Sequence, residues 1–357
     1  MEITNHLFPW LELMDQPAFC VKDETVAAVN SAAKQIMLQA DMDIREIITH
    51  NWQAYEQLHN GTLFLNITTG GQTYNACVNR TEDYDVFVID ESEDDIQLQT
   101  LSLAAQQLRI PLSNMISVAD TMFANLDRSD SDVQQQTGQI NRNLFQMMRI
   151  ISNMSDVKAY KNTTDLEKQN VNFTALFDEI IEKIQTVSES TQKKISYTGL
   201  DFTVIGLANE EQIGRAVYNL LSNALKFSPA DSAIDAKLSK SGNTLSFTVC
   251  NATEEPVSDY AFWHRYHRKP SIEDTGFGLG LGMTLISSVA CSHGGTVLID
   301  HPSAVETRIT MTLPIVKSKS NDVRSPIFRI GDYAGGWDKG LLELSEILPA
   351  DSYENIN

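Results

Sequence analysis

The stretch of the chain that most restricts its fold is a run of alternating glycines. Residues 276–282 read GFGLGLG, directly before the helix-forming run MTLI, so glycine stands at every second position: Gly276, Gly278, Gly280 and Gly282. Because glycine has no Cβ and loses the most conformational freedom in regular structure, the run predicts a loop whose backbone can approach a ligand closely. The unpaired amide groups at the start of the following helix favour a phosphate there.

Two common phosphate-binding loops do not fit this run. Phe277, Leu279 and Leu281 stand between the glycines, no GK[ST] follows, and no simple βαβ unit surrounds them. These absences exclude the P-loop and the dinucleotide-binding fingerprint. A glycine-rich loop with a purely structural role stays open on this feature alone.

A pair of asparagines upstream supplies a second feature. In NLLSNALKF, Asn219 and Asn223 are four positions apart and so lie on one face of a helix, with Lys226 three positions further on. An amide oxygen can complete the shell of a Mg²⁺ ion that keeps waters and phosphate oxygens, and an ammonium group can neutralise phosphate charge. Most isolated pairs of this kind are surface amides, but together with the glycine run they predict a nucleotide site.

The order of these features resembles one superfamily. The asparagine helix, a strand that ends TVCN, the loop FWHRYHR and the glycine run follow one another within about 60 residues. This order resembles the ATP-binding domain of the histidine-kinase, DNA-gyrase and Hsp90 superfamily (the GHKL or Bergerat fold), an α/β sandwich. The resemblance implies ATP and Mg²⁺ as cofactors, Asn223 as a metal ligand, Lys226 as a phosphate contact and the glycine run as a mobile lid.

One position departs from the family pattern. Relatives end the strand after the asparagine helix in an aspartate, which accepts a hydrogen bond from the adenine amino group, and a Gly-x-Gly follows shortly. Here the strand ends in Asn251 and continues ATEEPV, without glycine. An amide oxygen accepts the same hydrogen bond without a charge, so we expect adenine to bind detectably but more weakly.

Two long helices are expected ahead of this domain. Apolar residues recur at helical spacing from about residue 96 to 126, where Pro111 is expected to bend the helix. A second helix repeats apolar residues at intervals of three and four, a nearly heptad seam: Ile140, Leu144, Met147, Ile151, Met154 and Val157. Since two such helices joined by the polar turn DRSDSD cannot bury both apolar faces alone, we expect a homodimeric four-helix bundle through residues 96–160.

The first helix resembles the phosphoacceptor helix of sensor histidine kinases without its acceptor. The family pattern has His then Glu ahead of Leu-Arg-Thr-Pro-Leu, and AQQLRIPL keeps its framework at Leu108, Arg109, Pro111 and Leu112. Gln106 stands at the histidine position and Gln107 at the neighbouring acid. Ile110 replaces the polar residue with which relatives position water. With this unit the resemblance covers residues 96–317.

No other histidine is available on these helices. The chain has seven, and none lies between residues 60 and 263: His6, His50, His59, His264, His267, His293 and His301. A glutamine amide is not a nucleophile at neutral pH, and no general base stands beside it. Autophosphorylation on the usual helix is therefore not expected.

The remaining segments complete a multidomain α+β protein. Residues 1–92 predict two short strands, helices including one over 30–40, and a three-strand meander broken by Gly70 and Gly71, an order that resembles a PAS sensor domain. Such a unit either binds a small molecule or serves pairing and relay without a ligand. We expect a PAS-like domain at 1–92 and an antiparallel two-helix dimerisation domain at 93–165. An ATP-binding domain is expected at 168–317, with a mixed sheet that includes a strand at 201–206. The tail at 318–357 either docks or stays loosely ordered.

Composition limits the partners and the compartment. The formal net charge of −20 argues against a nucleic-acid surface. The four cysteines show no C-x-x-C spacing, and no run of about 18 apolar residues or secretory leader occurs, so we expect a cytoplasmic protein without a membrane span.

Two functional hypotheses follow. In the first, the chain binds Mg·ATP and is either a nucleotide-controlled pseudokinase or a kinase that phosphorylates an acceptor on another chain. In the second, it is a non-catalytic scaffold that pairs with an active kinase or a response regulator. In both, the N-terminal unit is expected to act through the tilt of the helix pair near Pro111.

Overall fold

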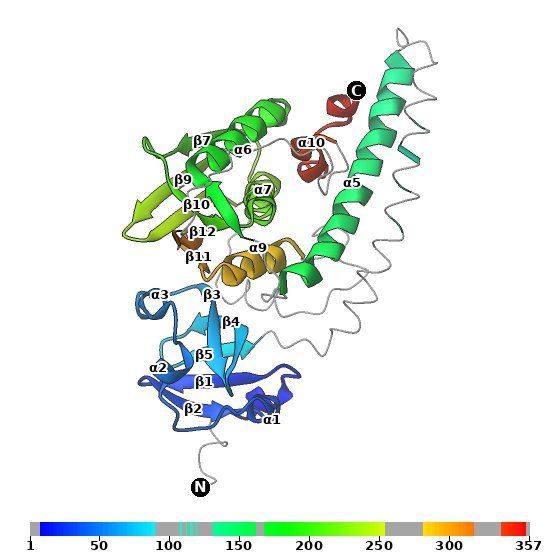
Figure 1. Ribbon diagram of the computed structural model, residues 1–357. Helices are drawn as coiled ribbons and strands as arrows, with labels where there is room; N and C mark the ends of the chain where they lie inside the picture. The colour runs from blue at the N-terminus through cyan, green and yellow to red at the C-terminus, as the bar shows by residue number, and fades with distance from the viewer. Residues whose placement is uncertain are drawn as a thin grey trace.

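The computed structural model of the chain describes residues 8–89, 131–161, 168–253, 281–317 and 337–354, with the single positions Leu108, Leu112, Met115, Ile116 and Ala119. For residues 154–161 and 281 it describes the helix backbone only. Figure 1 shows an N-terminal α+β unit, a larger α/β unit next to it, the long helix α5, and a C-terminal segment between α5 and the larger unit.

The N-terminal unit is an antiparallel sheet with short helices on its connections. Its strands run in the order β2-β1-β5-β4-β3. The predicted order of two short strands, helices and a three-strand meander is present in the elements η2 (Pro9–Leu13), β1 (Ala18–Lys22), β2 (Thr25–Val29), α1 (Ser31–Gln35), α2 (Ile44–Ile47), α3 (Trp52–Glu56), β3 (Thr62–Thr69), β4 (Gln72–Arg80) and β5 (Asp85–Ile89).

Asn30 organises the start of this unit. Its side-chain oxygen accepts hydrogen bonds from the amides of Ala18 and Ala33, which ties β1 to the N-terminus of α1. The helix predicted over 30–40 is wrong in length: α1 ends at Gln35, and Met37 adopts a left-handed conformation with φ of 68°. A residue in that conformation cannot continue a right-handed helix.

The larger unit is a mixed sheet covered on one face by three helices. Its strands run β11-β12-β10-β9-β7, antiparallel except for β7 beside β9. Helices α6, α7 and α9 pack on one face (Figure 1). The elements are β6 (Gln169–Asn172), α6 (Phe173–Ser188), η4 (Glu189–Thr191), β7 (Lys194–Thr198), β8 (Ile205–Ala208), α7 (Glu210–Phe227), β9 (Ala233–Ser241), β10 (Thr244–Ala252), α9 (Leu281–Ser292), β11 (Thr296–Ser303) and β12 (Glu306–Pro314).

The strand predicted at 201–206 as part of the main sheet is wrong in its start and in its sheet. β8 begins only at Ile205 and pairs with β6 in a separate two-stranded sheet. Phe202 is half exposed whereas Val204 is buried, and the Val204 carbonyl accepts the amide of Phe173 at the start of α6. The segment therefore secures the helix α6 and does not extend the main sheet.

The two units share one ten-stranded sheet. The edge strand β3 of the N-terminal unit pairs antiparallel with β11, joining Thr62, Leu63 and Phe64 to Ile299, Leu298 and Val297. Gly61 permits this approach, because a Cβ there would lie 2.3 Å from the Ile299 carbonyl oxygen. The Asn66 amide also donates to the Cys291 carbonyl at 2.8 Å, so β3 contacts α9 as well as β11.

Helix α5 (Ser131–Lys161) packs on the larger unit along one side. Only part of the predicted apolar seam is buried within the single chain. Leu144 and Ile151 are buried, whereas Ile140 and Met147 are about four-tenths exposed. Phe145 and Met148 take their place in the core. Despite the 31-residue length of α5, no helix in the described part of the chain is long and apolar enough to cross a membrane.

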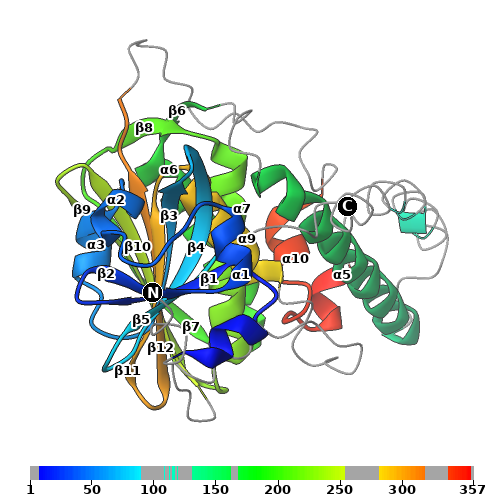
Figure 2. The same cartoon turned by 90° about the horizontal axis from the view of Figure 1, so that it is seen from below.

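The chain ends in a compact segment formed by α10 (Lys339–Glu343) and η5 (Ala350–Tyr353). It lies against α5 in both views (Figures 1 and 2). The sequence left open whether the tail docks or stays loosely ordered, and its described part is docked.

Candidate functional site

The predicted asparagine pair lies on α7, which is buried on almost every side. Asn209 caps the helix, because its side-chain oxygen accepts the amide of Gln212 at 3.1 Å. Asn219 is fully buried and Asn223 is partly exposed one turn later. The 3.6-residue period thus places both amides on one side of the helix, as the spacing predicted.

Gly282 brings the start of α9 against these two side chains. A Cβ on Gly282 would lie 3.3 Å from Asn219 Oδ1 and 3.7 Å from Asn223 Nδ2. The asparagine helix and the last glycine of the predicted loop therefore meet in space. Any larger residue at position 282 would occupy the volume beside both amides.

The oxygen of Asn219 is unsatisfied among the described residues. Asn219 Nδ2 donates to the Arg215 carbonyl at 3.0 Å, but Oδ1, although buried, has no hydrogen-bond partner there. A buried acceptor without a donor is unfavourable by a few kcal/mol unless a ligand or water completes it. Its position beside Gly282 fits a site that takes a polar ligand.

Asn251 lies near the end of β10 on the side of the sheet that the helices cover. Burial alternates along β10, and Asn251 shares its buried face with Leu245, Phe247 and Val249. Its Nδ2 group donates to the neighbouring Ala252 carbonyl at 2.8 Å. The side-chain oxygen is the group of this amide that can accept a hydrogen bond.

Lys226 points to a carboxylate of the C-terminal segment. Its Nζ lies 2.7 Å from Glu346 Oε2 and over the ring of Phe227. Burial alone would raise the pKa of the Glu346 carboxyl, but the charge of Arg149 and the hydrogen bond from Lys226 outweigh it, so this pKa lies below its ordinary value. The Glu346 carboxyl is therefore charged at neutral pH.

Several predicted positions lie outside the described residues. These are the two glutamines of the first predicted helix and most of the glycine run: Gln106, Gln107, Gly276, Gly278, Leu279 and Gly280. Leu281 opens α9, with its backbone alone described.

Sequence reasoning missed the support that His293 gives to α7. Its Nε2 accepts the amide of Asn209, the cap of α7, at 3.0 Å, and Nδ1 lies 2.8 Å from the Val289 carbonyl. Burial lowers the pKa of this imidazole to about 4, so it is neutral with Nδ1 as donor. The histidine sits between α9 and β11, and only its place just before Gly294 and Gly295 hinted at a structural role.

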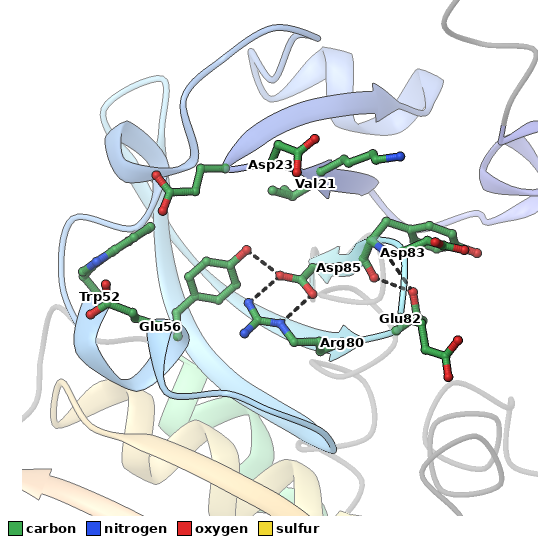
Figure 3. Close-up of a pocket in the computed structure, with 13 residues that line it drawn as sticks. Val21, Asp23, Trp52, Glu56, Arg80, Glu82, Asp83 and Asp85 are labelled. Carbon is green, nitrogen blue, oxygen red and sulfur yellow. Dashed lines mark hydrogen bonds and ion pairs between the residues drawn. The ribbon is translucent and has the colours of Figure 1, made fainter.

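The N-terminal unit contains a separate open pocket of about 340 Å³. Figure 3 shows dashed lines that join Arg80 to Asp85. These two hydrogen bonds measure 2.8 and 2.7 Å, and the Tyr55 hydroxyl donates to the same carboxylate at 2.6 Å. Burial and this hydrogen bond raise the pKa of the Tyr55 hydroxyl. The rim is acidic, with Asp23 and Glu82 among its side chains, and the polar groups at its centre satisfy one another.

Comparisons with known proteins give the class. Residues 208–317 match the family model "Histidine kinase-, DNA gyrase B-, and HSP90-like ATPase". The heme sensor protein HssS of Staphylococcus haemolyticus is 26% identical over 225 residues, which is 62% of this chain and 48% of that protein. The sensor histidine kinase CusS of Escherichia coli O157:H7 is 26% identical over 218 residues, 59% of this chain and 44% of that protein.

A solved structure gives a more distant likeness. Full-length ShkA in complex with AMPPNP matches at a TM-score of 0.48 and 18% identity, over 63% of this chain and 46% of that one. The two sequence relatives and the matched domain carry the assignment. Residues 208–317 are an ATP-binding domain of the histidine kinase, gyrase and Hsp90 class, and the chain is similar to sensor histidine kinases over about 60% of its length. It spans less than half the length of these two relatives.

Proposed function

We propose that this chain binds Mg·ATP between α7, the start of α9 and the end of β10. One observation carries the proposal: Asn219 and Asn223 converge on Gly282, and the buried Asn219 oxygen has no donor among the described residues. Because this oxygen is an acceptor, a Mg²⁺ ion or a water of its shell would satisfy it, and a phosphate oxygen would not.

The residues present fit the implied metal and base. The Asn223 amide oxygen would join the Mg²⁺ shell, and the ion when bound would neutralise phosphate charge. Asn251 would accept from the adenine amino group through a neutral oxygen, so we expect weaker binding than a carboxylate gives. The glycine run would close over the phosphates as a lid, with Gly282 as its fixed end.

Phosphoryl transfer to the chain's own helix is not part of the proposal. Gln106 and Gln107 replace the acceptor histidine and its neighbouring acid. The chain then acts as a nucleotide-controlled pseudokinase or phosphorylates an acceptor on another protein. The alternative function, a scaffold that pairs with an active kinase or a response regulator, is supported by the same substitutions and by the neutral Asn251.

The proposed domains are those expected from the sequence: PAS-like, dimerisation, ATP-binding and tail. The antiparallel sheet of the N-terminal unit, with its short strands first and its meander last, supports the PAS-like unit. Apolar side chains left exposed at heptad spacing support a homodimer through the long helices: Leu108 and Met115 on the first helix, Ile140 and Met147 on α5. A response regulator is the proposed downstream partner.

The pairing of β3 with β11 supports a second signal route. A change in the N-terminal sheet can reach α9 through this edge and through Asn66, without passing along the helix pair near Pro111. We propose that both routes act on the same nucleotide site.

Calorimetric titration of Mg·ATP into wild type and into Asn223→Ala tests the proposal. Wild type is expected to bind and Asn223→Ala to lose about 100-fold in affinity, since the metal would lose a ligand. Asn243→Ala is the matched control, because Asn243 is exposed in the turn at the opposite end of β10. Absence of binding at millimolar ATP would leave the scaffold as the function.

A further inference from the structure

The C-terminal segment, residues 337–354, forms part of the core. Leu342, Leu344, Leu348 and Tyr353 are each at most 1% exposed and belong to the same hydrophobic cluster as α5, α6 and α7. Figures 1 and 2 both show the segment between α5 and α7. It therefore connects the long helix to the ATP-binding unit.

Helix α5 holds the segment by its backbone and its aromatic rings. Asn141, Arg142 and Gln146 donate to carbonyl groups of Tyr353, Ser345 and Glu346 at 2.9 to 3.2 Å. The Phe145 ring packs edge-on against Trp337 and Tyr353. At Gly138 the approach is so close that a Cβ would lie 2.4 Å from the Ala350 carbonyl oxygen. The face of α5 is thus shaped to this segment.

Two carboxylates of the segment meet three cationic side chains from two helices. Glu343 lies 3.3 Å from Arg149 on α5 and 3.5 Å from Arg215 on α7. Glu346 lies 2.7 Å from Lys226 on α7 and 3.5 Å from Arg149. Without these carboxylates, Arg149 and Arg215 would be desolvated like charges at the contact between α5 and α7, which is strongly unfavourable. The segment supplies the counter-ions that allow the two helices to pack.

The same contacts engage the predicted phosphate-binding lysine. Lys226 lies three residues after Asn223 on α7, and its ammonium group is directed to Glu346. A phosphate oxygen and the Glu346 carboxylate would both have to pair with the ammonium group of Lys226. Two anions competing for one cation exclude each other in part, which makes segment docking and nucleotide binding antagonistic.

We propose that residues 337–354 are an autoinhibitory clasp, which fixes the ATP-binding unit on α5 and holds Lys226 away from nucleotide phosphate. The effect of the clasp on ATP binding rests on the proposed function, because it requires the nucleotide site described there. Binding of Mg·ATP weakens the Lys226–Glu346 contact and loosens the segment. A partner that removes the segment from α5 raises nucleotide affinity by the same linkage.

Titration of Mg·ATP into the full chain and into Glu346→Gln tests this competition. Glu346→Gln keeps the shape of the side chain and removes its charge, so its dissociation constant is expected to fall about fivefold, the scale of one partly exposed ion pair. In a Lys226→Ala background the same change is expected to have no effect. Glu354→Gln is the matched control, since Glu354 packs beside Gly138, eleven residues before Arg149 along α5.

Hydrogen exchange on wild type gives a second readout that needs no variant. Saturating Mg·ATP is expected to speed amide exchange across residues 337–354 by several-fold, because the segment loses one of its contacts. Equal ATP affinity in wild type and Glu346→Gln, with unchanged exchange in the segment, overturns the clasp and leaves the nucleotide site standing. If neither protein binds ATP, the proposed function itself fails, and the competition with it.

Discussion

Asn219 on α7 and Gly282 at the start of α9 are matched in size: a Cβ on the glycine would lie 3.3 Å from the amide oxygen of the asparagine. This distance is tighter than most real Cβ contacts, so the oxygen would have to move. Since Asn219 Oδ1 is a buried acceptor that lacks a donor among the described residues, the space in front of it is the space proposed for a ligand. Glycine at position 282 keeps that space open.

Gly282→Ala is therefore expected to weaken Mg·ATP binding about tenfold while changing the free energy of unfolding by less than about 1 kcal/mol, because alanine also favours the helix. Gly214→Ala on α7 is the control. Its added Cβ would meet only Ile180 Cδ1, at an ordinary 3.6 Å, so ATP affinity should not change. Calorimetry and chemical denaturation measure the two quantities, and equal ATP affinity in Gly282→Ala and wild type would contradict the assignment.

Local spacing allowed much of this site to be predicted. Asn219 and Asn223 share a helix face because the interval of four matches the helical period, and the glycine run marked the start of α9. The helix expected over 30–40 failed because a single left-handed residue, Met37, ends it, and apolar spacing carries no signal for that conformation.

Contacts between distant residues could not be predicted in this way. Arg149 and Glu343 are 194 positions apart, and nothing periodic in the sequence connects them. In the same way, β3 gave the pattern of an ordinary strand, with no sign that its outer edge pairs with β11. Burial of charge and edge pairing are properties of the packed chain.

Glu343→Gln should destabilise the protein by about 3 kcal/mol, since it removes the carboxylate that the buried side chains of Arg149 and Arg215 share. Asp338→Asn should cost at most about 1 kcal/mol. Its partner Lys183 is 28% exposed and the asparagine still caps α10. Urea denaturation at constant salt measures both. Similar losses for the two variants would mean that the buried carboxylate has no special part in the packing of α5 on α7.

Gly61→Ala should disrupt the pairing of β3 with β11, because the new Cβ would collide with the Ile299 carbonyl and the residue would keep a φ of 92°. Faster hydrogen exchange of the amides of residues 297–299 is the expected result. Gly71→Ala is the control, because it introduces backbone strain without a steric collision. Gly71 also has a positive φ, but nothing lies within 4 Å of the position of its Cβ. Comparable exchange in both variants would argue against the shared sheet as a signal route.

The double change Gln106→His with Gln107→Glu should restore incorporation of labelled phosphate from ATP if the nucleotide site is competent, because it supplies both the acceptor and its neighbouring acid. The product is expected to be acid-labile and to disappear when Asn223→Ala is added. Wild type should incorporate no phosphate on this helix. Failure of the rebuilt helix in a protein that binds ATP would favour a pseudokinase over a kinase acting on another chain.

His293 should make stability depend on pH between about 6.5 and 4. Burial lowers the pKa of the folded imidazole to about 4, so the unfolded chain binds a proton first as pH falls. The contribution is complete above pH 6.5 and is lost progressively towards pH 4, amounting to roughly 3 kcal/mol over that interval. Denaturation measured from pH 7 to 5 should therefore fall less steeply for His293→Gln than for wild type.

The exposed His50 provides the control for that measurement, because His50→Gln removes an imidazole that caps no helix. The stability advantage of wild type over His293→Gln should shrink by about 1 kcal/mol per pH unit below 6.5, since one proton is involved. His50→Gln should follow the wild-type curve. If His293→Gln also followed it, the imidazole could not be buried neutral against the Asn209 amide, and the support that it gives to the N-terminus of α7 would have to be assigned to another group.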